Sequence, residues 1–471
     1  MLSPGIRIGR MIMRDCRGLP ISNADMQQIE TLEAAHEAAL SFMGTPVDDM
    51  AAMLKDNPKF IMGHCFVAGL LTQAMETRIY NNMVRHLEAA EALYNAANYR
   101  ERGHIKAIRA WVDGDFHAAV EAWDAVLVDY PLDLLALQLA HLSDVLLGDT
   151  ANQRDRIGRV FPNWGESVPG YGYVLGFYSF GLEENRDFSR AEEYGRQAVA
   201  MNQNDVYAIH AVAHVMEMQG RQAGGIAWMN GREGVWANSN FANHLWWHLS
   251  LYYLDLGKYD RVLEVYDDKL RSSGAGGEKY EELDSTALLW RLKLLDVDVG
   301  RRWADLADRW EPSAQDTLYA FNDVHAMMTF AADNRRDAID VLINANERYL
   351  DDANDANVAM TRIIGIPFSR AIIGFCEGRY GDVVDLLLPI RYRTQYLGGS
   401  HAQRDIIAWT LLEAALRSRR FELALALANE RTQLKPTSPQ NWHLTARALR
   451  GRGDIAASER AEAHAQSATP A

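Results

Sequence analysis

Apolar residues along this chain recur every three or four positions, which is the spacing of helices that bury one face, and the alternation typical of strands is nearly absent. Residues 103–131 are the clearest example. Two helical patterns there flank a short polar turn at 113–116, and Pro131 closes the second pattern. Ala107 and Ala119 stand where two such helices would cross. The segment is therefore expected to fold as a helix–turn–helix unit.

The same layout recurs seven more times, with small residues at the expected crossing positions. A helix–turn–helix unit of about 34 residues is the tetratricopeptide repeat. The pattern predicts an all-α fold, a tetratricopeptide-repeat (TPR-like) α-solenoid whose right-handed superhelix closes around a central cavity. The seven further units are residues 172–205, 206–236, 243–270, 319–350, 364–390, 405–436 and 439–466.

The domain organisation follows from where these units begin. Residues 1–100 also have helical patterns, and we expect them to form a helical region packed on the array. Residues 101–471 are expected to form the tetratricopeptide-like repeats, so that the chain is one continuous domain. Two segments interrupt the array: the aromatic-rich loop 161–171, which should pack on its neighbours, and the Ser/Gly-rich segment 272–277, a predicted flexible linker.

The composition restricts the partners and the compartment. The 471 residues include 48 Lys and Arg against 63 Asp and Glu, a net charge of −15. A nucleic-acid binder or a membrane-surface anchor normally presents clustered basic residues, so we expect neither nucleic acid nor membrane as a partner. No stretch approaches the roughly 18 uncharged apolar residues of a membrane-spanning helix. Cys16, Cys65 and Cys376 are few and far apart, which fits a reducing cytoplasm.

Four of the 14 histidines fall close together as two pairs with a spacing of four. His210 and His214 share one helix face, which Glu217 joins three residues later. His244 and His248 repeat the spacing in the next repeat. Both pairs belong to the first helix of their repeat, the helix that lines the groove of such arrays. The sequence therefore predicts four imidazoles and one carboxylate facing a common cavity.

Three interpretations of this cluster remain open. The first is a divalent metal site for Zn²⁺ or Fe²⁺ with the four histidines as ligands, in which Glu217 and His214 are the catalytic candidates. Asp323 and His325 would add ligands there if the superhelix curls. The second is a binding pocket for a small molecule or peptide, with Trp247 among its walls. The third is a polar seam between helices. The lack of HExxH and of cysteine ligands weighs against the metal site.

A second group of candidates surrounds Gly398 and Gly399. These glycines permit a tight turn before a helix expected to begin near His401, and Arg391 and Arg404 lie on either side. Backbone N–H groups at the start of that helix, together with these guanidinium groups, could bind a carboxylate or a phosphate. The alternative is that Arg404 pairs with neighbouring side chains. No GxxxxGK[ST], GxGxxG or GxSxG motif occurs, so nucleotide-binding loops and α/β-hydrolases have no support.

Several longer stretches make the chain resemble the tetratricopeptide repeat protein 38 family, which is found in bacteria and in animals. The resemblance covers nearly the whole chain. It implies the fold and implies no particular reaction. The stretches that carry it are residues 57–64, 178–182, 210–218, 244–248, 321–325, 386–393 and 397–405.

These observations lead to one functional prediction with two alternatives. We expect a superhelical protein that binds a small molecule or a short peptide segment in a His-rich concave cavity. The alternatives are a metal-dependent enzyme that uses the two HxxxH pairs and a protein–protein interaction scaffold. A closed pocket of roughly some hundreds of Å³ would indicate a small ligand, whereas an open groove would indicate a scaffold. The sequence leaves a homodimer open.

Overall fold

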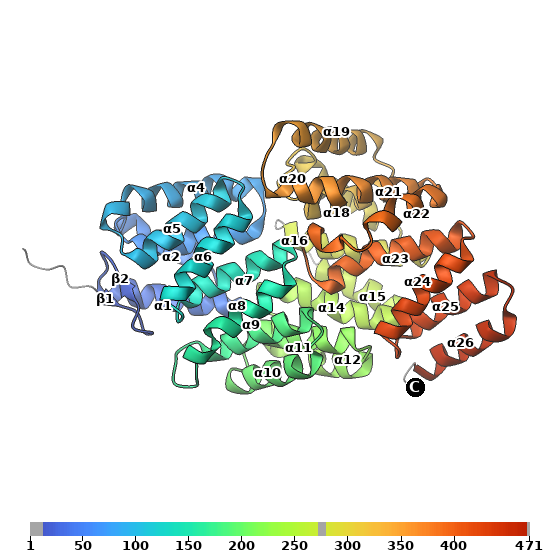
Figure 1. Cartoon of the computed structure of the whole chain (residues 1–471), viewed down its shortest axis with the longest axis horizontal. Coiled ribbons are helices and arrows are strands. Elements are labelled where there is room, and N and C mark those ends of the chain that lie inside the picture. The colour runs from blue at the N-terminus through green and yellow to red at the C-terminus, as the bar shows by residue number, and fades with distance from the viewer. Residues whose placement is uncertain (1–12, 272–278, 469–471) are drawn as a thin grey trace, which may run out of the picture.

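The computed structural model describes residues 13–271 and 279–468, and nearly every element in these ranges is a helix (Figure 1). The linker predicted at 272–277 lies outside the described residues. Two short strands, β1 (Met13–Arg14) and β2 (Pro20–Ile21), pair in antiparallel fashion near the N-terminus. The chain is an all-α solenoid of TPR-like helix pairs, and the fold class predicted from the periodicity is confirmed.

The eight predicted repeats all correspond to pairs of helices. Small residues at the crossings, such as Ala107, Ala119 and Ala191, are fully buried, so the two helices of a pair approach closely. The pairs are α5 (Tyr99–Val112) and α6 (Phe116–Asp129), α9 (Tyr171–Glu184) and α10 (Phe188–Met201), α11 (Val206–Met218) and α12 (Gln222–Asn230), α14 (Ala242–Asp255) and α15 (Tyr259–Val265), α18 (Ala320–Ala332) and α19 (Arg336–Asp352), α21 (Ile366–Cys376) and α22 (Tyr380–Leu387), α23 (His401–Arg417) and α24 (Phe421–Leu434), and α25 (Pro439–Gly451) and α26 (Ile455–Ala468).

Further helices are not part of these eight pairs. Two of them, α7 and α16, are buried along nearly their whole length, so they have no polar face and no amphipathic period to detect. Both line the centre of the solenoid. The further helices are α1 (Met26–Leu40), α2 (Pro46–Asp56), α3 (Ile61–Leu71), α4 (Thr77–Ala92), α7 (Leu134–Leu147), α8 (Thr150–Val160), α13 (Glu233–Trp236), α16 (Lys279–Leu294), α17 (Arg302–Trp310) and α20 (Ala356–Met360).

The loop 161–171 packs on the helices around it, as its aromatic residues predict. The indole N–H of Trp164 donates a hydrogen bond to the Pro131 carbonyl oxygen at 2.9 Å. The ring of Phe161 packs against Tyr178 of α9, with centroids 5.2 Å apart. The interruption of the repeat pattern is therefore an ordered connection between α8 and α9.

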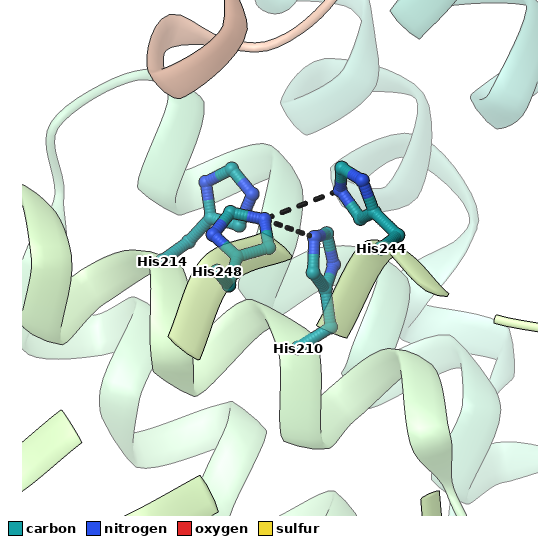
Figure 2. A group of neighbouring side chains, drawn as sticks. All are labelled: His210, His214, His244 and His248. Atoms are coloured by element: carbon teal, nitrogen blue, oxygen red, sulfur yellow. Dashed lines mark hydrogen bonds between the residues drawn. The ribbon is translucent and has the colours of Figure 1, made fainter. Parts of the chain in front are cut away.

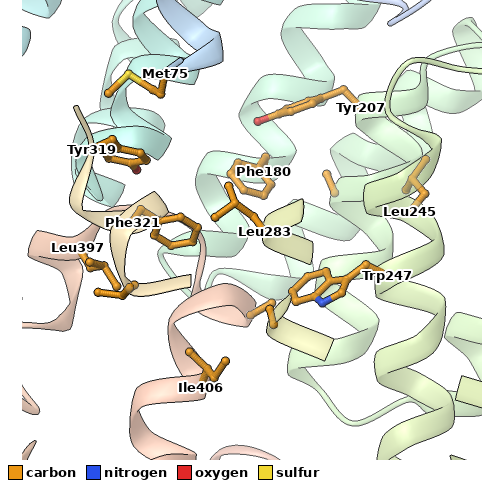
Figure 3. Packing of buried hydrophobic residues seen from close by; sticks show 14 of the residues in the cluster. Met75, Phe180, Tyr207, Leu245, Trp247, Leu283, Tyr319, Phe321, Leu397 and Ile406 are labelled. Atoms are coloured by element: carbon orange, nitrogen blue, oxygen red, sulfur yellow. The ribbon is translucent and has the colours of Figure 1, made fainter. Parts of the chain in front are cut away.

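The superhelix curls until its N-terminal half meets helices far along the chain. Buried side chains from α9, α16, α18 and α23 belong to one hydrophobic cluster there, including Phe180, Leu283, Phe321 and Ile406 (Figure 3). Hydrogen bonds between distant segments close the ring: Tyr319 hydroxyl to Leu146 carbonyl at 2.8 Å, Asn322 amide to Met75 carbonyl at 3.0 Å, Ala356 N–H to Gly114 carbonyl at 3.0 Å, and Gly399 N–H to Val145 carbonyl at 2.8 Å.

Gly398 is essential to this closure for two reasons. Its φ of +82° lies in the left-handed region, and a Cβ there would collide with the Leu146 backbone carbonyl oxygen. We expect Gly398→Ala to lower the free energy of unfolding by about 3 kcal/mol, because the backbone strain at positive φ and the collision of the new Cβ both destabilise the folded state. Gly378→Ala is the matched control, since its φ is +75° and nothing lies within 4 Å of the added Cβ. Urea unfolding of both variants measures the difference, and equal losses would show that the contact with Leu146 is unimportant.

One continuous helical stretch, Ala356–Cys376, is long and apolar enough to cross a membrane by length and composition. It joins α20 and α21 through the π-helical turn η6 (Thr361–Gly365). Two arginines, Arg362 and Arg370, lie within it, and 67% of its apolar window is buried inside the protein. Core helices of proteins outside membranes pass the same test, so this stretch is weak support for a membrane span.

Candidate functional site

The inner face of the curled solenoid surrounds a cavity of about 1470 Å³ that is partly open to solvent. This volume exceeds the roughly 300–1,000 Å³ of typical small-molecule sites. One wall is apolar and comes mainly from α7 and α9. Its residues are Leu142, Val145, Leu146 and Phe180. The charged side chains of the lining come from α13, α16 and η4 (Tyr266–Leu270).

Four histidines meet at the floor of this cavity (Figure 2). Helix α11 supplies His210 and His214, and the neighbouring helix α14 supplies His244 and His248. All four are buried, and one ring nitrogen from each lies within 4.8 Å of the others. The Nε2 atom of His248 is 3.1 Å from Nε2 of His210 and 3.2 Å from Nε2 of His244. The structure therefore brings together the two pairs that the spacing places on single helix faces.

Aromatic rings hold this histidine cluster in place. Phe180 stacks on His210 with centroids 5.5 Å apart, and Phe241 meets the same ring edge-on at 5.0 Å. Trp247 is fully buried and stacks on His244 at 5.2 Å. Because these rings fill the space around the imidazoles, the side chains cannot turn away from one another. Trp247 thus supports the cluster from behind, since it does not line the cavity.

Carboxylates lie behind three of the four imidazoles. His248 Nδ1 is 3.1 Å from Glu217 Oε2, whose other oxygen is 3.3 Å from the Lys435 ammonium. His244 Nδ1 is 2.9 Å from Asp284 Oδ2. The sequence predicts Glu217 because it shares a helix face with His210 and His214. Asp284 lies on α16, which has no detectable period, so no signal in the sequence connects it with the histidines.

Glu183 supplies the third carboxyl group beside the histidines, and the sequence pattern does not predict it either. Its Oε2 atom is 3.4 Å from His214 Nδ1, and both carboxylate oxygens lack a hydrogen-bond partner among the described residues. Burial, together with the neighbouring Glu184, raises the pKa of Glu183 well above its ordinary value. Glu183 therefore stands next to His214 in surroundings that disfavour its ionised form.

Burial keeps the imidazoles of His210, His214 and His248 uncharged at neutral pH. Burial lowers the pKa of His214 to about 4, and burial together with neighbouring imidazoles lowers the pKa of His210 and His248 well below its ordinary value. A neutral imidazole carries one N–H and one lone pair. The cluster can therefore donate hydrogen bonds, accept them, or bind a metal ion.

Asp323 and His325 lie apart from this cluster, although the superhelix does curl. His325 turns back on its own helix, where Nδ1 donates to the Phe321 carbonyl oxygen at 2.7 Å. Asp323 is buried, and burial raises its pKa to about 7. Within residues 13–271 and 279–468, neither belongs to a group of three or more ligand-type side chains close enough for a metal ion.

The two arginines of the second candidate group each have a partner within the protein. Arg391 pairs with Glu430 at 2.6 Å near the surface. Arg404 is buried and pairs with Glu184 of α9 at 3.2 Å. The backbone N–H of His401, at the start of α23, donates to the other Glu184 oxygen at 2.8 Å. The anion-binding position predicted at this helix start is therefore filled by a carboxylate of the chain itself.

The fold and this cavity define a class of protein: an all-α TPR-like solenoid with a His-lined central cavity. No family model matches the chain. Solved structures with a similar arrangement include the human IFIT1 dimer with m7Gppp-AAAA, at 11% identity over 95% of this chain and 96% of that chain, with a TM-score of 0.40. Yeast Tom70 is similar at 11% identity over 93% and 88%, with a TM-score of 0.34. Both similarities are too low to inform function, which must come from the site.

Proposed function

We propose that the protein captures a short peptide segment with positively charged side chains in its central cavity. The observation that carries the proposal is the charge of the cavity wall. Among the described residues, four carboxylates line the cavity, from Glu233, Asp268, Glu281 and Asp284, against one Lys or Arg side chain, Lys269. Carboxylates arranged along a partly dehydrated wall attract cations and repel anions.

The size and the second wall of the cavity favour a peptide over a small molecule. Its volume of about 1470 Å³ holds a segment of several residues. The lining offers both the apolar side chains of α7 and α9 and the carboxylates, so a segment that carries apolar and basic side chains satisfies both. Phe241 and Trp246 add aromatic faces, on which the stems and charged ends of Lys and Arg pack well.

We also propose that the chain belongs to the tetratricopeptide repeat protein 38 family and works in the cytoplasm. Two of the stretches that carry the family resemblance, 210–218 and 244–248, supply all four histidines of the cavity floor. Three free cysteines dispersed over the described chain fit a reducing compartment.

Fluorescence anisotropy with labelled nonapeptides tests peptide capture. We expect an alternating Lys/Leu peptide to bind and an alternating Glu/Leu peptide of equal length not to bind. The double variant Glu233→Gln/Asp268→Asn should weaken binding about tenfold, equivalent to about 1.4 kcal/mol, since two attractive charges are lost. Glu459→Gln is the matched control, because this exposed carboxylate lies on α26, outside the cavity lining.

Three outcomes would contradict the proposal. The acidic peptide could bind as tightly as the basic one. The double variant could bind the basic peptide as the unaltered protein does. A single-stranded RNA of similar length could bind more tightly than either peptide, which would also overturn the prediction that nucleic acid is not a partner.

A further inference from the structure

We propose that His210, His214, His244 and His248 bind one divalent first-row transition ion at the floor of the cavity, with Zn²⁺ as the ion to test. This inference does not rest on peptide capture. A metal ion is measured without any peptide, so the two proposals can fail separately.

The hydrogen-bond pattern of His244 and His248 is the first argument. A carboxylate accepts hydrogen bonds, so His248 Nδ1 carries a hydrogen toward Glu217, and His244 Nδ1 carries one toward Asp284. With those hydrogens on Nδ1, Nε2 is the atom through which each ring would bind a metal ion. These two Nε2 atoms face each other at 3.2 Å. A cation bound to both of them makes this contact favourable.

His248 is fully buried and packs against the three other imidazoles of the cluster. His210 can supply at most one hydrogen from Nε2, and that hydrogen bridges only its own contact with His248 at 3.1 Å. A metal ion satisfies all three Nε2 atoms at once.

The pair of His64 and His86 shows what an ordinary buried histidine contact looks like in this protein. His64 Nε2 donates to the Pro58 carbonyl oxygen at 3.1 Å, so its Nδ1 has the lone pair. His86 Nδ1 lies 3.0 Å away and donates to that lone pair. One hydrogen lies between the two rings, and no carboxylate holds either of them at hydrogen-bonding distance in the described structure. The cluster at the cavity floor differs, because carboxylates hold two of its rings at hydrogen-bonding distance.

The carboxylates match the surroundings of metal-binding histidines. Such histidines usually donate their other ring N–H to a carboxylate, which fixes the tautomer and points the lone pair at the metal. Glu217 and Asp284 do this for His248 and His244, and Glu183 lies 3.4 Å from Nδ1 of His214. Three carboxylates from three different helices, α9, α11 and α16, surround one set of imidazoles.

The distances also suit a transition ion. Two nitrogens bound to Zn²⁺ at about 2.0–2.1 Å in a tetrahedral site lie about 3.3 Å apart. The measured Nε2 separations of 3.1 and 3.2 Å are close to this value. Both nitrogens of His214 are buried without a hydrogen-bond partner in the described structure, so this ring is available as the fourth ligand. An all-imidazole set selects zinc, copper, nickel or iron over calcium and magnesium.

The position of the site gives the ion access to the cavity. His210, His214 and His244 line the cavity, whereas His248 lies behind them. An ion held by these rings faces the space in which we place the peptide segment.

Zinc titration of full-length protein tests the site. The protein is prepared without a His tag, treated with a chelator and dialysed, and Zn²⁺ is added in a calorimeter. We expect one tight site per chain, and we expect His248→Asn to weaken it at least 100-fold. His86→Asn is the matched control, because it removes a buried imidazole from the other histidine pair and should leave zinc binding unchanged.

A second measurement avoids the risk that a variant fails to fold. X-ray absorption at the zinc edge of the unaltered protein should show three or four nitrogen ligands at about 2.0–2.1 Å. Asp284→Asn keeps the size of the side chain and should weaken zinc binding about 10- to 100-fold without changing the stoichiometry. An oxygen-dominated shell, no zinc uptake by the unaltered protein, or full binding by a folded His248→Asn variant would each overturn the proposal.

Discussion

Glu184→Ala should lower the free energy of unfolding by about 3–5 kcal/mol, because it leaves a buried cation without its partner. Arg404 is 7% exposed, and its ion pair with Glu184 joins α23 to α9, more than two hundred residues earlier. The same carboxylate accepts the backbone N–H of His401 at the start of α23. Alanine removes both interactions at once, and the contact between the two ends of the curled array should weaken with them.

Glu430→Ala is the control for this prediction, since Glu430 pairs with the other arginine of the group, Arg391. Glu430 is half exposed, and surface ion pairs of this kind contribute about 0–1 kcal/mol. Urea unfolding gives both values, and hydrogen exchange shows whether α9 and α23 lose protection together, which matters because repeat arrays do not always unfold in one step. Equal losses in the two variants would mean that the buried pair does not stabilise the closed ring.

The contrast between helix types explains how much of the fold the sequence predicts. Helices such as α5 and α6 have one apolar face, so their period and the small crossing residues Ala107 and Ala119 identify them. Helices α7 and α16 are surrounded on all sides and have lost that period. Periodicity therefore misses these two helices, although both contribute residues to the cavity lining.

The residues of the candidate site also fall into two groups, those that the sequence predicts and those that it does not. A spacing of four on one helix places His210 beside His214 and His244 beside His248, so the histidines can be found from sequence alone. Asp284 and Glu183 come from helices that meet α14 and α11 only through the packing of the solenoid, and local spacing has no information about that. Asp323 is predicted to join the site if the superhelix curls. The superhelix does curl, but Asp323 lies apart from the histidines, so curling alone does not bring a residue to the site.

Zinc should raise the free energy of unfolding by about 2.7 kcal/mol at a free concentration of 100 times Kd and by about 4.1 kcal/mol at 1,000 times Kd, if the unfolded chain does not bind it. The ligands come from two neighbouring helices, α11 and α14, so the ion joins adjacent repeats at the centre of the array. Chelator should remove this gain. Urea unfolding with and without chelator measures it, and hydrogen exchange should show protection rising first in these two helices.

The controls for zinc stabilisation separate the histidine cluster from chance binding elsewhere. Mg²⁺ and Ca²⁺ should give no gain, since they prefer oxygen ligands. The gain should persist in His86→Asn and disappear in His248→Asn. If His248→Asn gained as much stability from zinc as the unaltered protein, the ion would be binding elsewhere. The close approach of the His244 and His248 Nε2 atoms would then need another explanation, such as a hydrogen bond between the two rings.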